Sequence, residues 1–501
     1  MTEKSAERSK NIVLNSIYGF STWLLPLALS FFATPVIVRS LGHEDYGIYA
    51  LVLGFIAYSF NFNVGRAITK YIAEYRAVGE IEKITEVISA TLFINLALGG
   101  AGLLIIFSTA NLLVTDVLKI QADAQEKSVY ALYIAGLTIF FLMLNQVFNA
   151  IIQGLHRFDV YAKIFNLNNI LLISGNLILA LKGFGLLYLL SWNLLITALS
   201  ATLSAIIAKR LLPEFSLNLK FRRETLKLVF GYSSGVIAYQ ILANILLLFE
   251  RSWITGKLGA ESLTFYVVPM MLALYIHGFI SSLMLVIFPL ASELKNEKEK
   301  LLQLYQKATK IVSFLAVFLG ATLIVESRTF LTLWIGADFA DKSTALLIIH
   351  TITFSLLAIQ IVAWQTTEGL GYPNYNCYLF VICFIISIFG MIWLISDYGN
   401  FGVAVARMVG FGTLFLSIFY VEKRFFDKIY LRFWLKLLVV LTVSTVLAVV
   451  IESFLSAKLG VSWFSLIFSG AVGGLAYCLT AWLLGFVTDD EIALLRRIIK
   501  R

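Results

Sequence analysis

The residues of this chain best able to do chemistry are charged side chains inside long apolar segments or at their ends. Arg407 lies inside one such segment and has no acidic neighbour in the sequence, whereas Glu250 and Arg251 end another. Arg66 and Lys70 are spaced so that both lie on one face of a helix. Ionisable groups at such positions are costly and mark functional sites by default. The surplus of cations indicates binding of an anion such as a phosphate.

Each of these groups also has a structural interpretation. Arg407 can form an interhelical salt bridge or extend toward the membrane surface. Arg66 and Lys70 can anchor a helix end in the headgroup layer, and Glu250 can pair with Arg251. The sequence leaves both interpretations open, and the functional one predicts that all five side chains line a substrate cavity.

Four amide side chains complete the set of predicted cavity residues. Asn61 and Asn63 lie in one apolar segment, and Gln240 and Asn244 lie one helical turn apart in another. Amides at these positions can hydrogen-bond to sugar hydroxyls. They can equally hold neighbouring helices together, at about 0.6–2 kcal/mol each.

The other ionisable residues do not form a recognisable enzyme site. The sequence lacks a phosphate-binding loop for ATP, and its 4 histidines have no metal-ligand spacing. We therefore expect a protein that is not an enzyme, with no catalytic residue, no metal site and no cofactor. Glu326, Arg328 and Glu452 lie near segment ends and are predicted to be surface residues.

Apolar segments make up most of the chain and must position these side chains. The 501 residues are 59% hydrophobic and 14% charged, with a mean hydropathy of +0.87, whereas soluble domains carry roughly 25% charged residues. Apolar segments of about 20 residues are long enough to cross a bilayer as helices. The sequence thus predicts an all-α polytopic membrane protein with about 14 transmembrane helices. They are expected near residues 12–36, 45–64, 84–108, 129–152, 164–181, 184–208, 228–249, 262–290, 308–326, 343–367, 377–396, 400–421, 437–457 and 463–487.

The distribution of positive charge predicts how the chain is oriented. The formal net charge is +9, and most of the 39 Lys and Arg residues lie in gaps on the same side as the N-terminus. Such a bias is typical of cytoplasmic loops. We expect both termini to be cytoplasmic, and the basic character then needs no nucleic-acid partner.

The first twelve segments form two copies of one six-segment pattern. Gly42 corresponds to Gly259 at the same point of the pattern, and Gly185 corresponds to Gly402 at the same separation. An even number of spans per copy predicts parallel repeats, related by a pseudo-two-fold axis along the membrane normal. The expected parts are an N-terminal six-helix bundle (1–210), a cytoplasmic linker (211–227), a C-terminal six-helix bundle (228–424), and helices 13 and 14 with a cytoplasmic tail (425–501).

Several short motifs resemble the polysaccharide flippases of the multidrug/oligosaccharidyl-lipid/polysaccharide exporter superfamily. Residues 39–51 (RSLGHEDYGIYAL) resemble the opening of these proteins. Residues 254–259, Trp334-Ile335-Gly336 and the Gly-Leu pairs at 154–155 and 369–370 continue the likeness. The motifs cover essentially the whole chain, and they indicate the family better than any substrate.

The resemblance implies a flippase for surface polysaccharide biosynthesis in the cytoplasmic membrane. Such a protein moves a polyprenyl-pyrophosphate-linked oligosaccharide by alternating access through a basic central cavity. The expected partners are this substrate, membrane lipids, and possible polysaccharide polymerase and glycosyltransferases. The sequence leaves open whether a coupling ion, H⁺ or Na⁺, is used.

Three alternatives remain at this point. A drug/cation antiporter of the same superfamily has twelve spans and an acidic site in its first bundle, but the first span here has no Asp or Glu. A lipid II flippase shares the fourteen spans and the cationic cavity. A non-transporting membrane scaffold for polysaccharide assembly would have no cavity lined by the cations named above.

Overall fold

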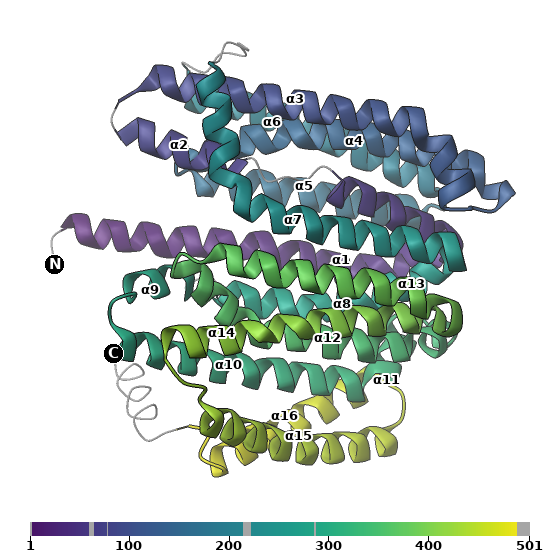
Figure 1. Ribbon diagram of the computed structural model, residues 1–501. Helices are drawn as coiled ribbons and strands as arrows, with labels where there is room; N and C mark the ends of the chain where they lie inside the picture. Colours follow the sequence, from purple (N-terminus) through teal and green to yellow (C-terminus); the bar gives the residue numbers. More distant parts are fainter. Residues whose placement is uncertain (1–2, 60–64, 78, 214–221, 285–286, 488–501) are drawn as a thin grey trace. The chain divides into compact units, whose positions relative to one another are not determined.

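The computed structural model describes residues 3–59, 65–77, 79–213, 222–284 and 287–487, which form α-helices joined by short connections (Figure 1). These residues contain no β-strand. The chain divides into two compact units, Met1–Thr264 and Phe265–Arg501.

The described residues of the first unit form seven α-helices, a short π-helix (Leu113–Val117) and the start of an eighth α-helix. α7, expected to begin the C-terminal bundle, packs against α1, α2 and α3 in this unit. The compact units therefore divide one helix later than the expected bundles, whose boundary follows the sequence repeat. The helices are α1 Glu3–Tyr58, α2 Gly65–Ala77, α3 Ile81–Leu112, α4 Ala122–Gly154, α5 Phe158–Leu181, α6 Leu186–Leu211 and α7 Arg223–Leu258.

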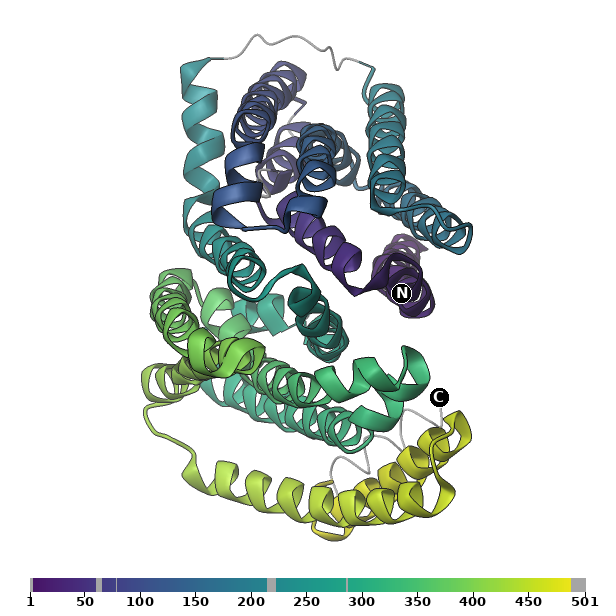
Figure 2. The same ribbon diagram turned by 90° about the vertical axis from the view of Figure 1, so that its right-hand side faces the viewer.

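The second unit contains the remaining helices. α12 packs on α10 and α13, and α15 packs on α10 and α16. Figures 1 and 2 both show α15 and α16 side by side. The helices are α8 Ala260–Met284 (its first residues belong to the first unit), α9 Ile287–Glu293, α10 Lys298–Val325, α11 Ser327–Trp334, α12 Ala337–Gly369, α13 Pro373–Gly412, α14 Leu416–Phe425, α15 Leu431–Leu459 and α16 Trp463–Leu483.

The prediction of an all-α polytopic membrane protein is confirmed. In the described part of the chain, 11 helical segments are long and apolar enough to cross a membrane. Two of them join a pair of predicted spans, because α1 bends at Gly42 and α13 bends at Gly399. The count of fourteen spans stays a prediction.

The sequence repeat is also a repeat of backbone conformation. Gly42 has φ 76° and ψ 167°, and Gly259, between α7 and α8, has φ 86° and ψ 164°. At the ends of α4 and α12, His156 (φ 59°) and Gly371 (φ 91°) follow the repeated Gly-Leu pairs. Left-handed conformations are unfavourable for residues with a Cβ, so the two copies conserve the positions at which their helices must end.

α2 is a short helix whose apolar residues pack inside the first unit. In the structure Ile68 and Ile72 are fully buried and pack against Ile88 of α3 and Ile151 of α4. The apolar face of α2 is therefore part of the core of the first unit.

Candidate functional site

Arg251 of α7 is a buried cation in the first unit. Its exposed fraction is 7%. One Nη1–H donates to the backbone oxygen of Ala50 in α1, and the guanidinium carbon lies 5.3 Å from the centre of the Tyr58 ring. A carbonyl acceptor and a π face together compensate a guanidinium that has left water.

Gly54 makes this contact possible. A Cβ at this position would lie 2.7 Å from Cδ of Arg251, closer than such atoms approach in proteins. The absence of a side chain therefore lets Arg251 lie directly on the backbone of α1. Its neighbour Glu250 is also buried, with an exposed fraction of 0%.

For the other predicted residues of the first unit, the structure describes the side chain in only two cases. Gln240 and Asn244 are half-buried on α7, one turn apart. Arg66 and Lys70 lie on α2, one turn apart as predicted, but their side chains are outside the described set. The predicted residues Asn61 and Asn63 lie outside the described residues.

Arg407 is a buried cation of the second unit. It lies on α13 beyond the bend at Gly399, and its exposed fraction is 0%. One Nη1–H donates to Sδ of Met270 on α8 at 2.8 Å. The guanidinium carbon lies 5.9 Å from the ring centre of Phe354 and 5.6 Å from that of Phe411. Arg407 thus links α13 to α8 and α12 through contacts with a polarizable sulfur atom and aromatic rings.

An apolar groove runs between α10, α12 and α15. Its cavity has a volume of about 450 Å³. Val317, Leu356, Ile359, Trp434 and Leu441 are among the residues that line it. Its dimensions and lining suit an alkyl or isoprenoid chain better than a polar ligand.

A basic pocket of about 230 Å³ adjoins this groove and shares Leu437 with it. Lys307 and Lys310 of α10 and Lys436 of α15 line the pocket. Lys310 also lies over the ring of Phe486, 4.7 Å from its centre. Three ammonium groups beside an apolar groove can hold a phosphate whose lipid chain lies in the groove.

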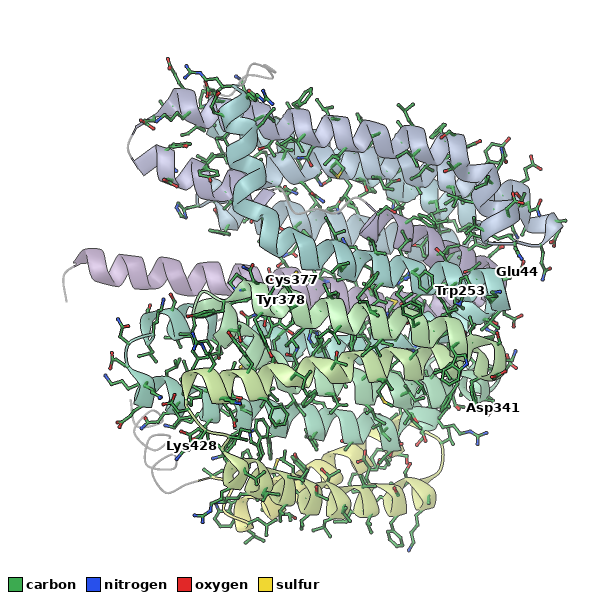
Figure 3. All side chains as sticks on the ribbon, viewed as in Figure 1. Glu44, Trp253, Asp341, Cys377, Tyr378 and Lys428 are labelled. Carbon is green, nitrogen blue, oxygen red and sulfur yellow. The ribbon has the colours of Figure 1, made fainter. Side chains whose placement is uncertain are left out.

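Glu422 fixes the wall of the groove. This carboxylate at the end of α14 has an exposed fraction of 0%. It accepts hydrogen bonds from Nε1 of Trp434 at 2.6 Å and from the backbone N–H of Tyr430 at 2.8 Å. Because Trp434 lines the groove, Glu422 links the start of α15 to the helix bundle. Figure 3 shows Lys428, in the connector between α14 and α15, at this end of the unit.

The sequence does not predict the lysine pocket. The basic residues belong to two separate gaps, one ending near Lys307 and the other near Lys436, and positive charge in such gaps is also a topology signal. The mixture of Lys and Arg with Phe, Tyr and Trp in residues 422–436 was the available signal. The pairing of α10 with α15, which no sequence pattern contains, brings the lysines together.

Comparisons with known proteins agree with this architecture. A family model described as a polysaccharide biosynthesis protein matches residues 36–344, more than half of the chain. A protein of Shigella flexneri, named as a candidate O-antigen transporter, is 22% identical over 419 residues. The match covers 79% of this chain and 94% of that protein.

Two solved structures show the fold. The lipid II flippase MurJ, in an inward closed conformation, matches with a TM-score of 0.69 and 16% identity, covering 94% of this chain and 98% of that chain. An inward-facing multidrug resistance MATE transporter of the MOP superfamily matches with a TM-score of 0.67 and 18% identity, covering 81% and 98%. The fold is therefore the one that these transporters share.

Proposed function

Because the chain belongs to the family of polysaccharide biosynthesis proteins, we propose that it is a flippase for a polyprenyl-pyrophosphate-linked oligosaccharide. The protein lies in the cytoplasmic membrane with both termini in the cytoplasm. It moves the substrate to the outer leaflet by alternating access between the two repeats. It performs no covalent chemistry.

The observation that carries this proposal is the lysine pocket beside the apolar groove. A polyprenyl pyrophosphate combines a long apolar chain with an anionic head. The groove of about 450 Å³ suits the chain, and Lys307, Lys310 and Lys436 suit the pyrophosphate. A cationic drug would be repelled by the same three lysines.

The buried guanidinium groups have a second role in this proposal. Moving a pyrophosphate through a medium of low dielectric constant requires fixed cations that offset its desolvation. Arg251 and Arg407 supply one cation in each unit. The other predicted cavity residues, Arg66, Lys70, Asn61, Asn63, Gln240 and Asn244, belong to this proposal as further contacts to the head group.

The test is the leaflet distribution of lipid-linked oligosaccharide in cells depleted of this protein. We expect accumulation on the cytoplasmic face, rescue by the wild type, and poor rescue by the triple variant with Lys307, Lys310 and Lys436 each changed to Gln. The matched control changes the exposed Lys295 and Lys300 to Gln and should rescue fully. Normal surface delivery after depletion, in a strain with no redundant flippase, would refute the proposal.

A second substrate is favoured by one comparison. The lipid II flippase covers 94% of this chain, whereas the multidrug transporter covers 81%. Lipid II is also a polyprenyl pyrophosphate and would use the same groove. Accumulation of lipid II on the cytoplasmic face in the depleted cells, with normal oligosaccharide delivery, would assign the protein to that substrate.

A further inference from the structure

Two carboxyl groups are buried together in the second unit, at the end opposite Lys428. Glu326 lies between α10 and α11, and Glu452 lies on α15. Their exposed fractions are 2% and 1%, so the expectation that they are surface residues is wrong. Figure 3 shows Asp341, the partner of the exposed Arg328, at this end of the unit.

The two carboxyl groups have different surroundings. Glu326 accepts hydrogen bonds from Oγ of Ser469 at 2.8 Å and from Oγ of Ser456 at 3.2 Å. It also precedes the first turn of α11, where backbone N–H groups favour an anion. Glu326 therefore has two side-chain hydrogen-bond donors.

Glu452 has no such support. Its Oε1 is buried and has no hydrogen-bond partner among the described residues. Its carboxyl points at α16, where Cβ atoms added at Gly470 and Gly473 would lie 3.7 Å from Oε1 and 3.1 Å from Oε2. The two glycines leave room for the carboxyl but offer no side chain to bind it.

No cation balances the pair in the described part of the chain, where neither carboxyl has a Lys, Arg or His nitrogen within 4.0 Å. The titratable side chains of α16 are Tyr477, whose hydroxyl donates to the oxygen of Phe314, and the exposed Cys478. The nearby cations are engaged elsewhere. Arg328 on α11 binds Asp341 of α12, and Lys458 on α15 lies over Phe454.

Two adjacent carboxylates do not both ionise in an apolar interior when no cation offsets their mutual repulsion. We propose that Glu326 and Glu452 form a proton-binding site, in which Glu452 carries one proton. Loss of this proton puts an uncompensated negative charge between α10, α15 and α16, and it loosens the two C-terminal helices. This inference does not depend on the proposed substrate.

The sign of the pH dependence follows from proton counting. The folded protein keeps a proton on Glu452 that the unfolded chain releases at neutral pH. Stability therefore falls as the pH rises and this proton is lost. We expect the thermal unfolding temperature of the full chain in detergent to fall between pH 6 and pH 9 by more in the wild type than in Glu452→Gln.

Infrared spectroscopy gives a second measurement. The wild type at pH 7 should show the C=O band of a protonated carboxyl group in an apolar environment. Glu452→Gln should lose this band, and Glu326→Gln should keep it. The control Glu299→Gln, at an exposed position on α10, should leave the band and the pH profile unchanged.

Three results would overturn the proposal. The first is a Glu452→Gln variant that keeps both the wild-type pH dependence of thermal unfolding and the C=O band. The second is the absence of the band in the wild type, which decides the matter even if the variants do not fold. The third is recovery of stability at pH 9 by NaCl but not by choline chloride, since this would identify a sodium site.

Discussion

The side chain of Arg251 in α7 lies on the backbone of α1 at Gly54, which a Cβ would block. The contact joins the first helix of the second repeat to the second span of the first repeat. It also explains why a cation at the end of a span is 93% shielded from solvent rather than extended toward the membrane surface, since its exposed fraction is 7%.

The first prediction follows from this contact. Gly54→Ala should destabilise the protein by about 1–3 kcal/mol, because the new methyl group must displace Arg251 or α1. Thermal unfolding in detergent measures the change. Gly100→Ala is the matched control: nothing lies within 4 Å of a Cβ there, so the change should be neutral or stabilising by up to about 1 kcal/mol. Equal stability of the two variants would contradict the packing described here.

The second prediction concerns the repeated glycines. Gly42→Ala and Gly259→Ala should each cost about 1–2 kcal/mol, because both residues have a left-handed conformation. Asn should be no better tolerated, because a positive φ with ψ near 165° is essentially restricted to glycine. Gly412→Ala serves as the control, since Gly412 is helical and faces open space. The same unfolding measurement applies, and a cost at only one of the two repeated glycines would argue against their equivalence.

The third prediction separates the role of Arg407 in transport from its role in packing, and it rests on the proposed function. Arg407→Lys should keep its positive charge but lose the planar contacts with Phe354 and Phe411. We expect a well-expressed protein whose flipping rate falls roughly tenfold, equivalent to about 1.4 kcal/mol in the barrier. Arg407→Ala should be lower still.

The control for Arg407 is Arg424→Ala, at an exposed position of α14. Leaflet accessibility of the lipid-linked oligosaccharide, normalised to protein in the membrane, is the measurement for all three variants. Wild-type flipping by a folded Arg407→Ala variant would restrict this residue to a structural role.

The fourth prediction concerns the connector between α14 and α15. Glu422→Ala should destabilise the protein by about 2–3 kcal/mol, since it leaves the N–H groups of Trp434 and Tyr430 without their acceptor. Proteolysis within residues 426–430 should become faster. Lys423→Ala, at the exposed neighbouring position, should have no such effect. An unchanged cleavage rate in Glu422→Ala would show that the connector is held by other contacts.

The sequence by itself determined the class of the protein and the positions of most helices. Hydropathy and helix-ending glycines are local properties, so Gly42, Gly259 and the Gly-Leu pairs could be interpreted without knowing what they contact. Arg407 could be marked as a candidate site residue, because an arginine within an apolar segment is costly, but the sequence left its burial open.

Only the tertiary structure decided which distant groups meet. Glu326 and Glu452 lie near the ends of their segments, where a sequence pattern favours exposure, but α15 and α16 cover them. Lys307 and Lys436 belong to different basic gaps and share a pocket because α10 packs on α15. The physical reason is that hydropathy records a residue's preference for lipid or water, whereas its charged and polar partners are chosen by helix packing between segments far apart in the chain.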